Sequence, residues 1–292
     1  MKYIPQIIVK EDPAQEVKLF LSFLHHEYYK NLRHSILNNF PSLKESLDKS
    51  SNEEKCVAEF LDNFYKENRV QADRIIRESK NLFEDKSGEA LKILGGLMDY
   101  EWEESVVYTA TPTILSFSPF HGNTFFFSIL SGLRNKETKE KNVLSVAVHE
   151  ISHFVFLDQV KRLEFNNKIM KVSKETTDYI KESLAVVLLN QEPLKSLLEI
   201  EGYLGNPEIR SLRVKREARV LKISEFLNEC FQRTKIENKM TFSDFLCEVF
   251  ESVYPADSMF QEKRKIWNQL SLAKDNGKIR LETIYAEPIK VD

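Results

Sequence analysis

The most constraining feature of the sequence is a pair of histidines, His149 and His153, set four residues apart in the almost wholly apolar stretch 143–157. An apolar run of this length predicts a buried helix, and residues i and i+4 lie one above the other on one helical face. The two imidazoles can therefore each offer a nitrogen to a single ion. Glu150 is turned about 100° around the helix from His149, where its carboxylate can reach a water on that ion without being a ligand.

The segment His149-Glu150-Ile151-Ser152-His153 resembles the H-E-x-x-H helix of zinc metallopeptidases of the zincin superfamily. Neutral imidazole is a good zinc ligand, and a catalytic zinc takes three protein ligands and one water. The ion lowers the pKa of that water, and a nearby carboxylate takes its proton. The resemblance implies one Zn²⁺ per chain, held in part by His149 and His153, with Glu150 as the general base.

The residues around the motif also follow the longer zincin pattern. That pattern has Val or Thr three residues before the first His, uncharged residues around the Glu, and an apolar residue two after the second His. The complying positions are Val146, Ala147, Ile151, Ser152, Phe154 and Val155. The alternative is a core helix with two structural histidines, but a charged Glu at the centre of an apolar helix would then need another explanation.

The resemblance points to Glu182 as the third ligand. Metzincins place Gly three and His six residues after the second His, where this chain has Phe156 and Gln159, so their pattern is excluded. Gluzincins instead take a Glu from a following helix. The E-S-L-A stretch that begins at Glu182, 29 residues after His153, matches their Glu-small-Leu-Ala stretch and lies in apolar surroundings.

Two other acids, Glu175 and Asp178, stay open as the third ligand. Asp178 lies one turn before Glu182 on the same face, so it could instead orient a ligand histidine. Some gluzincins carry an orienting Asp four residues after their Glu, but here that position is Val186. The orienting partner is therefore unassigned.

A β-rich segment precedes the motif helix. Its strand candidates, rich in β-branched and aromatic residues, are residues 106–111, 113–118 and 123–130. Residues 119–123 have the composition of a turn, so the segment should end in a hairpin. In zincins the first strand of such a hairpin is the edge of the sheet, and the substrate adds to it as an antiparallel strand. The resemblance places that edge strand at residues 113–120.

Two tyrosines are candidates for stabilising the oxyanion, a task that gluzincins give to a Tyr or His. Tyr203 lies in a glycine-bearing loop, and Tyr179 precedes Glu182 by three residues. A tyrosine that simply packs a turn is an equal alternative for Tyr203.

These features predict an α+β, mostly helical protein with a zincin-like core: a small sheet with an edge-strand hairpin, the active-site helix, a Glu helix and a helical C-terminal part. We expect a helical N-terminal region, residues 1–104, and a zincin-like region, residues 105–292. The further expected elements are a short strand over 4–9, helices starting at Asp12 and Ser51, a short helix over 88–100, a long helix over 206–233, helices starting at Thr241 and Pro255, and a terminal strand over 279–289.

Composition narrows the class of protein. The net charge of -3, from 42 basic and 45 acidic residues, gives no reason to expect nucleic acid or an anionic membrane as a partner. The 3 cysteines are scattered and odd in number, which fits a reducing compartment. The apolar residues near the N-terminus are too few for a secretory h-region and no later run approaches transmembrane length, so we expect neither a secretory leader nor a membrane span. A cytoplasmic protein is therefore expected.

The leading interpretation is zinc-dependent hydrolysis of a peptide bond, with a peptide or protein as substrate and Glu150 as general base. A second interpretation is a catalytically idle zincin-like scaffold that acts as a protein-binding or regulatory module. A third is a helical interaction protein in which the motif is accidental.

Overall fold

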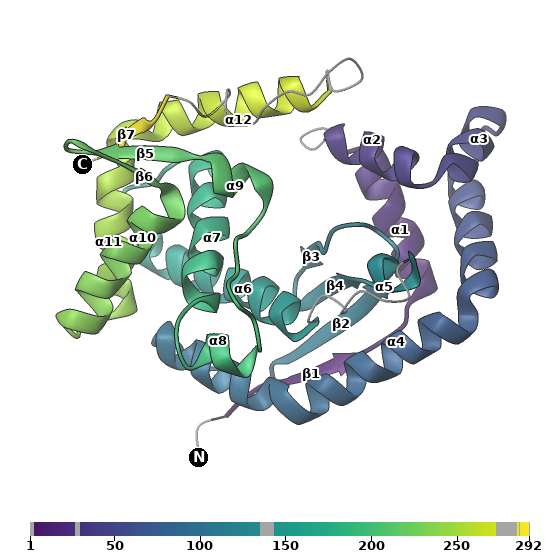
Figure 1. The fold of residues 1–292 in the computed structure, drawn as a ribbon, viewed down its shortest axis with the longest axis horizontal. Coiled ribbons are helices and arrows are strands. Elements are labelled where there is room, and N and C mark those ends of the chain that lie inside the picture. Colours follow the sequence, from purple (N-terminus) through teal and green to yellow (C-terminus); the bar gives the residue numbers. More distant parts are fainter. Residues whose placement is uncertain (1–2, 27–29, 135–142, 273–284, 286, 292) are drawn as a thin grey trace. The chain divides into compact units, whose positions relative to one another are not determined.

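The computed structural model describes residues 3–26, 30–134, 143–272, 285 and 287–291 of the 292-residue chain. Helices form most of the described chain, and two small mixed sheets are also present, which confirms an α+β, mostly helical protein (Figure 1). The helices are α1 Pro13–Leu24, α2 Lys30–Asn39, α3 Pro41–Lys49, α4 Glu53–Leu97, α5 Leu130–Arg134, α6 Val143–Phe165, α7 Lys174–Leu189, α8 Leu194–Leu197, α9 Pro207–Ser211, α10 Ile223–Phe231, α11 Phe242–Val253 and α12 Asp257–Leu272. The strands are β1 Gln6–Val9, β2 Val107–Thr113, β3 Phe120–His121, β4 Thr124–Ser128, β5 Arg213–Arg216, β6 Arg219–Lys222 and β7 Ile289–Val291.

The chain divides into two compact units. Unit 1 comprises Met1–Ile4, Glu89–Glu103 and Ile151–Asp292, and unit 2 comprises Pro5–Gly88 and Glu104–Glu150. The predicted division into residues 1–104 and 105–292 stays a prediction; in the structure, residues 5–88 group with residues 104–150.

Unit 2 is built on a four-stranded sheet of order β1-β2-β4-β3 (Figure 1). β1, β2 and β4 run parallel, and β3 pairs antiparallel with β4. The ring of Phe83, on α4, contacts those of Phe125 and Phe127, with centroids 6.3 and 6.2 Å apart. Residues two apart on a strand share a face, so these contacts place α4 on one face of the sheet. The intervening Phe126 is also buried, which makes β4 a core strand on both sides.

The predicted edge strand over residues 113–120 is wrong for most of its length. Thr113 ends β2, residues 114–119 lie outside the strands, and the antiparallel edge is the two-residue β3. A buried side chain explains the break, because the backbone N–H of Ile114 donates to the carboxylate of Glu16 at 2.9 Å rather than to a neighbouring strand. The chain returns to the sheet only at Pro119, whose carbonyl accepts from Phe126 N.

Two helix predictions in unit 2 had opposite outcomes. The start of α1 is confirmed, because the Asp12 side chain accepts from Gln15 N at 3.0 Å and Pro13 opens the helix. The two helices expected over residues 51–100 are instead one 45-residue helix, α4. Gly88, read as a break, lies inside it. A mid-helix Gly costs only about 1 kcal/mol, and buried neighbours such as Ala90 and Leu91 hold the helix together.

Unit 1 is mainly helical. Helix α7 packs against α10 and α12, and Phe156 of α6 stacks on Phe250 of α11 with ring centroids 6.5 Å apart. Gln159 of α6 donates to the carbonyl of Met98 at 2.8 Å, which ties the end of the α4 segment to α6. The helix start at Thr241 is confirmed by a capping box with Asp244.

The long helix expected over residues 206–233 is wrong. The chain makes the short α9, then the antiparallel hairpin β5–β6, and only then α10. The hairpin turns at Glu217, whose φ of 53° is left-handed. Its turn lacks the Asn-Gly or Asp-Gly pair that normally announces such a hairpin. Most of the strand expected over residues 279–289 lies outside the described residues, and β7 begins at its end and pairs parallel with β5.

Among the described helices, α6 passes a length and composition test for crossing a membrane, with a mean hydropathy of 1.2 over its best window. That corrects the expectation that no run approaches transmembrane length. The evidence for a span is weak, because 67% of the window is buried inside the protein, as in the core helix of many proteins.

Candidate metal centre

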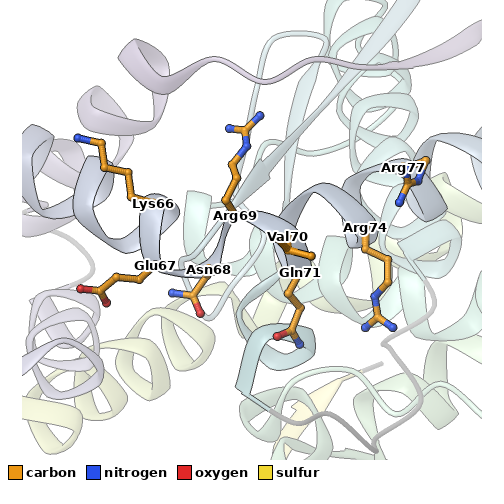
Figure 2. A pocket seen from close by; sticks show the side chains of 8 residues that line it. All are labelled: Lys66, Glu67, Asn68, Arg69, Val70, Gln71, Arg74 and Arg77. Atoms are coloured by element: carbon orange, nitrogen blue, oxygen red, sulfur yellow. The ribbon is translucent and has the colours of Figure 1, made fainter.

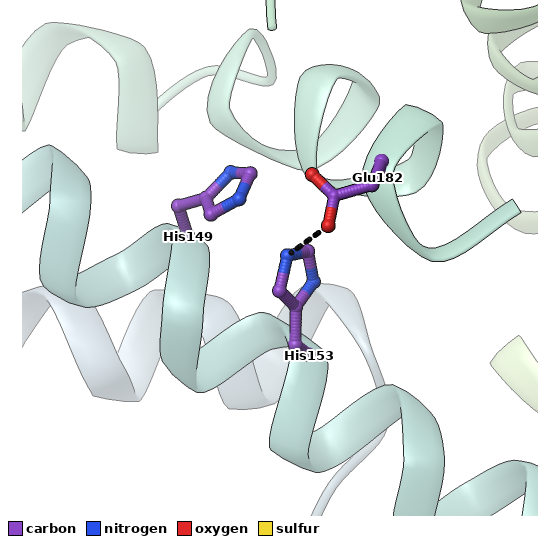
Figure 3. Close-up of side chains that lie close together, drawn as sticks. All are labelled: His149, His153 and Glu182. Carbon is purple, nitrogen blue, oxygen red and sulfur yellow. Dashed lines mark ion pairs between the residues drawn. The ribbon is translucent and has the colours of Figure 1, made fainter. Parts of the chain in front are cut away.

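Helix α6 presents two histidines from consecutive turns. His149 and His153 are 8% and 1% exposed, and the helix around them is packed on apolar neighbours such as Val148 and Ile151, both fully buried. Both imidazoles project from the same side of α6 toward α7 (Figure 3). This is the arrangement that the i, i+4 spacing predicts.

Glu182, on α7, faces the two histidines. One ligand atom from each of His149, His153 and Glu182 lies within 4.8 Å of the others, a group that could hold a metal ion. Glu182 Oε1 is 3.2 Å from His153 Nε2 (Figure 3). Zinc bonds of about 2.0–2.2 Å at tetrahedral angles separate two ligand atoms by about 3.4 Å. His153 and Glu182 are therefore already at ligand spacing, and a donor set of two imidazoles and one carboxylate suits zinc.

The N-terminus of α7 is fixed by Asp257, the first residue of α12. Asp257 Oδ1 accepts from Ser173 N at 2.9 Å and from the hydroxyls of Ser173 and Thr176, each at 2.6 Å. Burial raises the pKa of Asp257, but these bonds and one from Gln261 outweigh it and leave the pKa below its usual value. The start of α7, and with it the register of Glu182, is thus held by an ionised carboxylate.

The two rival acids on α7 do not belong to the ligand group. Glu175 lies seven residues before Glu182 and is in the first turn of the helix, roughly 10 Å along the axis. Asp178 lies one turn before Glu182, but its Oδ1 is 3.4 Å from the ammonium of Lys181. Of the described His, Cys, Asp and Glu residues, the structure gathers His149, His153 and Glu182.

Glu150 stands beside this group without being part of it. Its Oε1 lies 3.8 Å from His149 Nε2, and its side chain is 8% exposed. The carboxylate is thus held near the His149 ring, but on the flank of the ligand face. A water bound by the group would lie within reach of this carboxylate, which is the position of a general base.

Lys181 is a neighbour of the site that the sequence reasoning missed. Its ammonium lies 3.5 Å from Glu182 Oε1, and only 10% of its side chain is exposed. A lysine beside a glutamate is common in sequences and indicates nothing by itself. The one signal in the sequence is that a lysine rarely occurs within an apolar helix.

The two tyrosines have different surroundings. Tyr179 is fully buried, and its hydroxyl donates to Glu208 Oε1 at 2.6 Å, so it is committed to the interior of unit 1. Tyr203 is half-buried, and its backbone is held at both N and O by the side chain of Asn190 at the end of α7. Gly205 packs this loop on Val186, since a Cβ there would lie 2.7 Å from the Val186 side chain. Tyr203 thus belongs to a loop on the Glu182 face of α7.

A separate hollow of about 650 Å³ lies along α4 in unit 2 (Figure 2). The described residues that line it include four cations, Lys66, Arg69, Arg74 and Arg77. Two of these are already paired, Lys66 with Asp62 at 2.5 Å and Arg69 with Asp73 at 3.0 Å. None of the three ligand residues is among the described residues that line the hollow.

Comparisons with known proteins leave the family open. No family model matches the chain, and no solved structure matches it. Among curated proteins, the chain is similar to Protein Hook homolog 3 of Xenopus laevis and of Mus musculus, in each case 26% identical over 156 residues. The match covers 53% of this chain and 20% of the length of each relative. The match does not bear on the metal centre.

Proposed function

We propose that this protein is a zinc-dependent peptidase of gluzincin type, in which His149, His153 and Glu182 hold one Zn²⁺. The observation that supports this most is the gathering of those three side chains from two helices, 29 residues apart in sequence, at ligand spacing. Chance can place an H-E-x-x-H pattern in a helix, but it rarely adds a carboxylate from another helix at the right distance.

The chemistry divides between the ion and the chain. Zinc bound here would act as a Lewis acid that polarises the substrate carbonyl and acidifies water. Glu150 takes the proton of the attacking water and then gives it to the amine that leaves, so a positioned carboxylate serves first as base and then as acid. Its near-complete burial limits competing solvent and strengthens its interaction with the charges around it.

The proposed substrate is an extended peptide or a protein segment. In the described sheet β3 has β4 as its neighbour on one side and ends the strand order on the other. A strand at the edge of a sheet can offer backbone donors and acceptors to an added strand. The free thiols of Cys56, Cys230 and Cys247 support a reducing, cytoplasmic setting for this reaction.

A second candidate is a zincin-like scaffold that keeps the metal site but binds a protein instead of cutting it. The similarity of part of the chain to Protein Hook homolog 3 is compatible with this candidate. Both candidates require the same ligands, so metal content does not separate them. Turnover of a diverse peptide library, with and without a chelator, does.

The test of the mechanism is Glu150→Gln. We expect this variant to keep zinc and its melting temperature, because no ligand is lost and a buried charge is removed. Hydrolysis of any peptide that the wild type cleaves should fall by about 10²–10⁴-fold or more, because an amide cannot carry the proton. His153→Ala is the matched control and should lose both zinc and activity. A Glu150→Gln protein with zinc and full turnover would overturn the peptidase mechanism, and an inactive wild type with zinc would favour the scaffold.

A further inference from the structure

We propose that Lys181, anchored by Asp178, is a positioning residue that fixes Glu182 as a metal ligand. The inference rests on the proposed metal site and assigns it an outer partner. Lys181 Nζ lies 3.5 Å from Glu182 Oε1 and 3.4 Å from Asp178 Oδ1. One ammonium therefore joins two carboxylates on successive turns of α7.

The contact lies in a largely buried part of α7, where an ammonium needs a partner. The side chains of Lys181 and Asp178 are 10% and 13% exposed, whereas that of Glu182 is 25% exposed. A buried ammonium is costly unless it is paired. Asp178 provides that pairing from three residues earlier, where a helix brings side chains together. The pair is electrically neutral, so it can be kept beside a metal centre.

The lysine restrains the carboxylate of Glu182. Glu182 Oε1 has the ammonium at 3.5 Å and His153 Nε2 at 3.2 Å, so one oxygen is held from two directions. A carboxylate on a free side chain would lose rotamer freedom when it binds an ion. A carboxylate already fixed at ligand spacing loses little, which favours binding. Outer partners of this kind orient ligands and set metal affinity.

The opposing effect is repulsion between the ammonium and the ion. Asp178 counters it, because its negative charge lies 3.4 Å from Nζ and cancels most of the lysine's field farther away. Positioning therefore prevails over repulsion. We infer that the sign of the effect on affinity is positive: removing the lysine weakens metal binding.

The experiment measures zinc affinity of the full-length protein by competition with a coloured chelator. Lys181→Met keeps the unbranched stem and removes the charge, and its affinity should fall about 10–100-fold. Lys174→Met, which replaces an exposed lysine in the first turn of the same helix, is the matched control and should bind like wild type. Lys181→Arg retains a cation able to contact both carboxylates and should recover most of the affinity.

A second readout separates positioning from general stability. The visible absorption of the cobalt(II)-loaded protein reports the coordination geometry, and it should change in Lys181→Met and not in Lys174→Met. If Lys181→Met does not fold, Asp178→Asn tests the same contact, since it releases the ammonium from its anchor and should also weaken binding. Unchanged or tighter binding by a folded variant overturns this proposal while the metal site stands. A wild type that binds no zinc overturns both.

Discussion

Two glutamates of unit 1, Glu182 and Glu208, differ in the partners of their carboxylates. Glu182 faces a candidate metal ligand, whereas Glu208 is held by hydrogen bonds inside the protein. Glu208 is almost fully buried, and its oxygens are taken by fixed donors: the hydroxyls of Tyr179 and Tyr285 at 2.6 and 2.8 Å, and Arg264 Nη1 at 3.0 Å. Glu182 is more exposed and faces an imidazole nitrogen at 3.2 Å.

The difference lies in what surrounds the lone pairs of each carboxylate. Three fixed donors, each with its own hydrogen, occupy the oxygens of Glu208. The nearest ring nitrogen to Glu182 belongs to another candidate ligand, and neutral imidazole can bind a metal through that atom. Burial raises the pKa of Glu208, opposed by Arg264 and the two tyrosines, and the charge of Glu182 raises it further. Burial of an acid is thus not by itself the mark of a metal site.

We expect the strongest effect on zinc affinity when Glu182, the proposed ligand, is replaced. Glu182→Ala should weaken zinc binding by more than the roughly 100-fold that loss of an outer partner causes, because one of three ligands disappears. Its melting temperature without metal should change little. Elemental analysis and chelator competition measure the effect. Glu175→Ala, on the same helix, should bind zinc like wild type, and the reverse result would move the ligand to Glu175.

Replacing Glu208, the buried glutamate of the pair, should lower the stability of the protein. Glu208→Gln removes the carboxylate charge that pairs with the buried Arg264, which should cost about 3–5 kcal/mol in the free energy of unfolding. Urea unfolding of the metal-free protein measures it. The control is Glu229→Gln, which breaks an exposed ion pair with Arg219 and should cost at most about 1 kcal/mol. Equal losses in the two variants would contradict the structural role of Glu208.

Glu16 of unit 2 is another buried carboxylate, and its expected effect on stability is smaller. Burial raises its pKa from 4.5, and hydrogen bonds from Ile114, Thr113 and Tyr65 oppose the rise. The folded protein therefore holds this proton more tightly than the unfolded chain. The resulting stabilisation is fully present below pH 4.5 and is lost as the pH rises through the raised pKa.

Glu16→Gln should remove that pH dependence, because the amide does not titrate. The free energy of unfolding of the variant, measured in urea from about pH 4 to pH 8, should decline less with rising pH than that of the wild type. Parallel curves for the two proteins would show that Glu16 does not titrate in this range.

Local signals in the sequence led to correct structure where the structure is itself local. Asp12 caps α1 and Thr241 caps α11 because a side chain reaches an amide three residues along the chain. Where a local signal was missing, the prediction failed. The turn at Glu217 carries no glycine or asparagine, so the β5–β6 hairpin was read as helix. Glu16 interrupts the predicted edge strand from 98 residues away, which no local pattern could reveal.

The sequence by itself determined that His149 and His153 share one helical face and that Glu150 lies beside them, because the period of a helix fixes positions four and one residues apart. The resemblance to gluzincins then favoured Glu182. Which of the three acids on α7 lies beside His153 depends on packing, because it follows from how Asp257 anchors α7 and how α7 lies beside α6. The same holds for the pairing of Lys181 and for the burial of Glu208, because both are contacts made by packing and not by spacing along the chain.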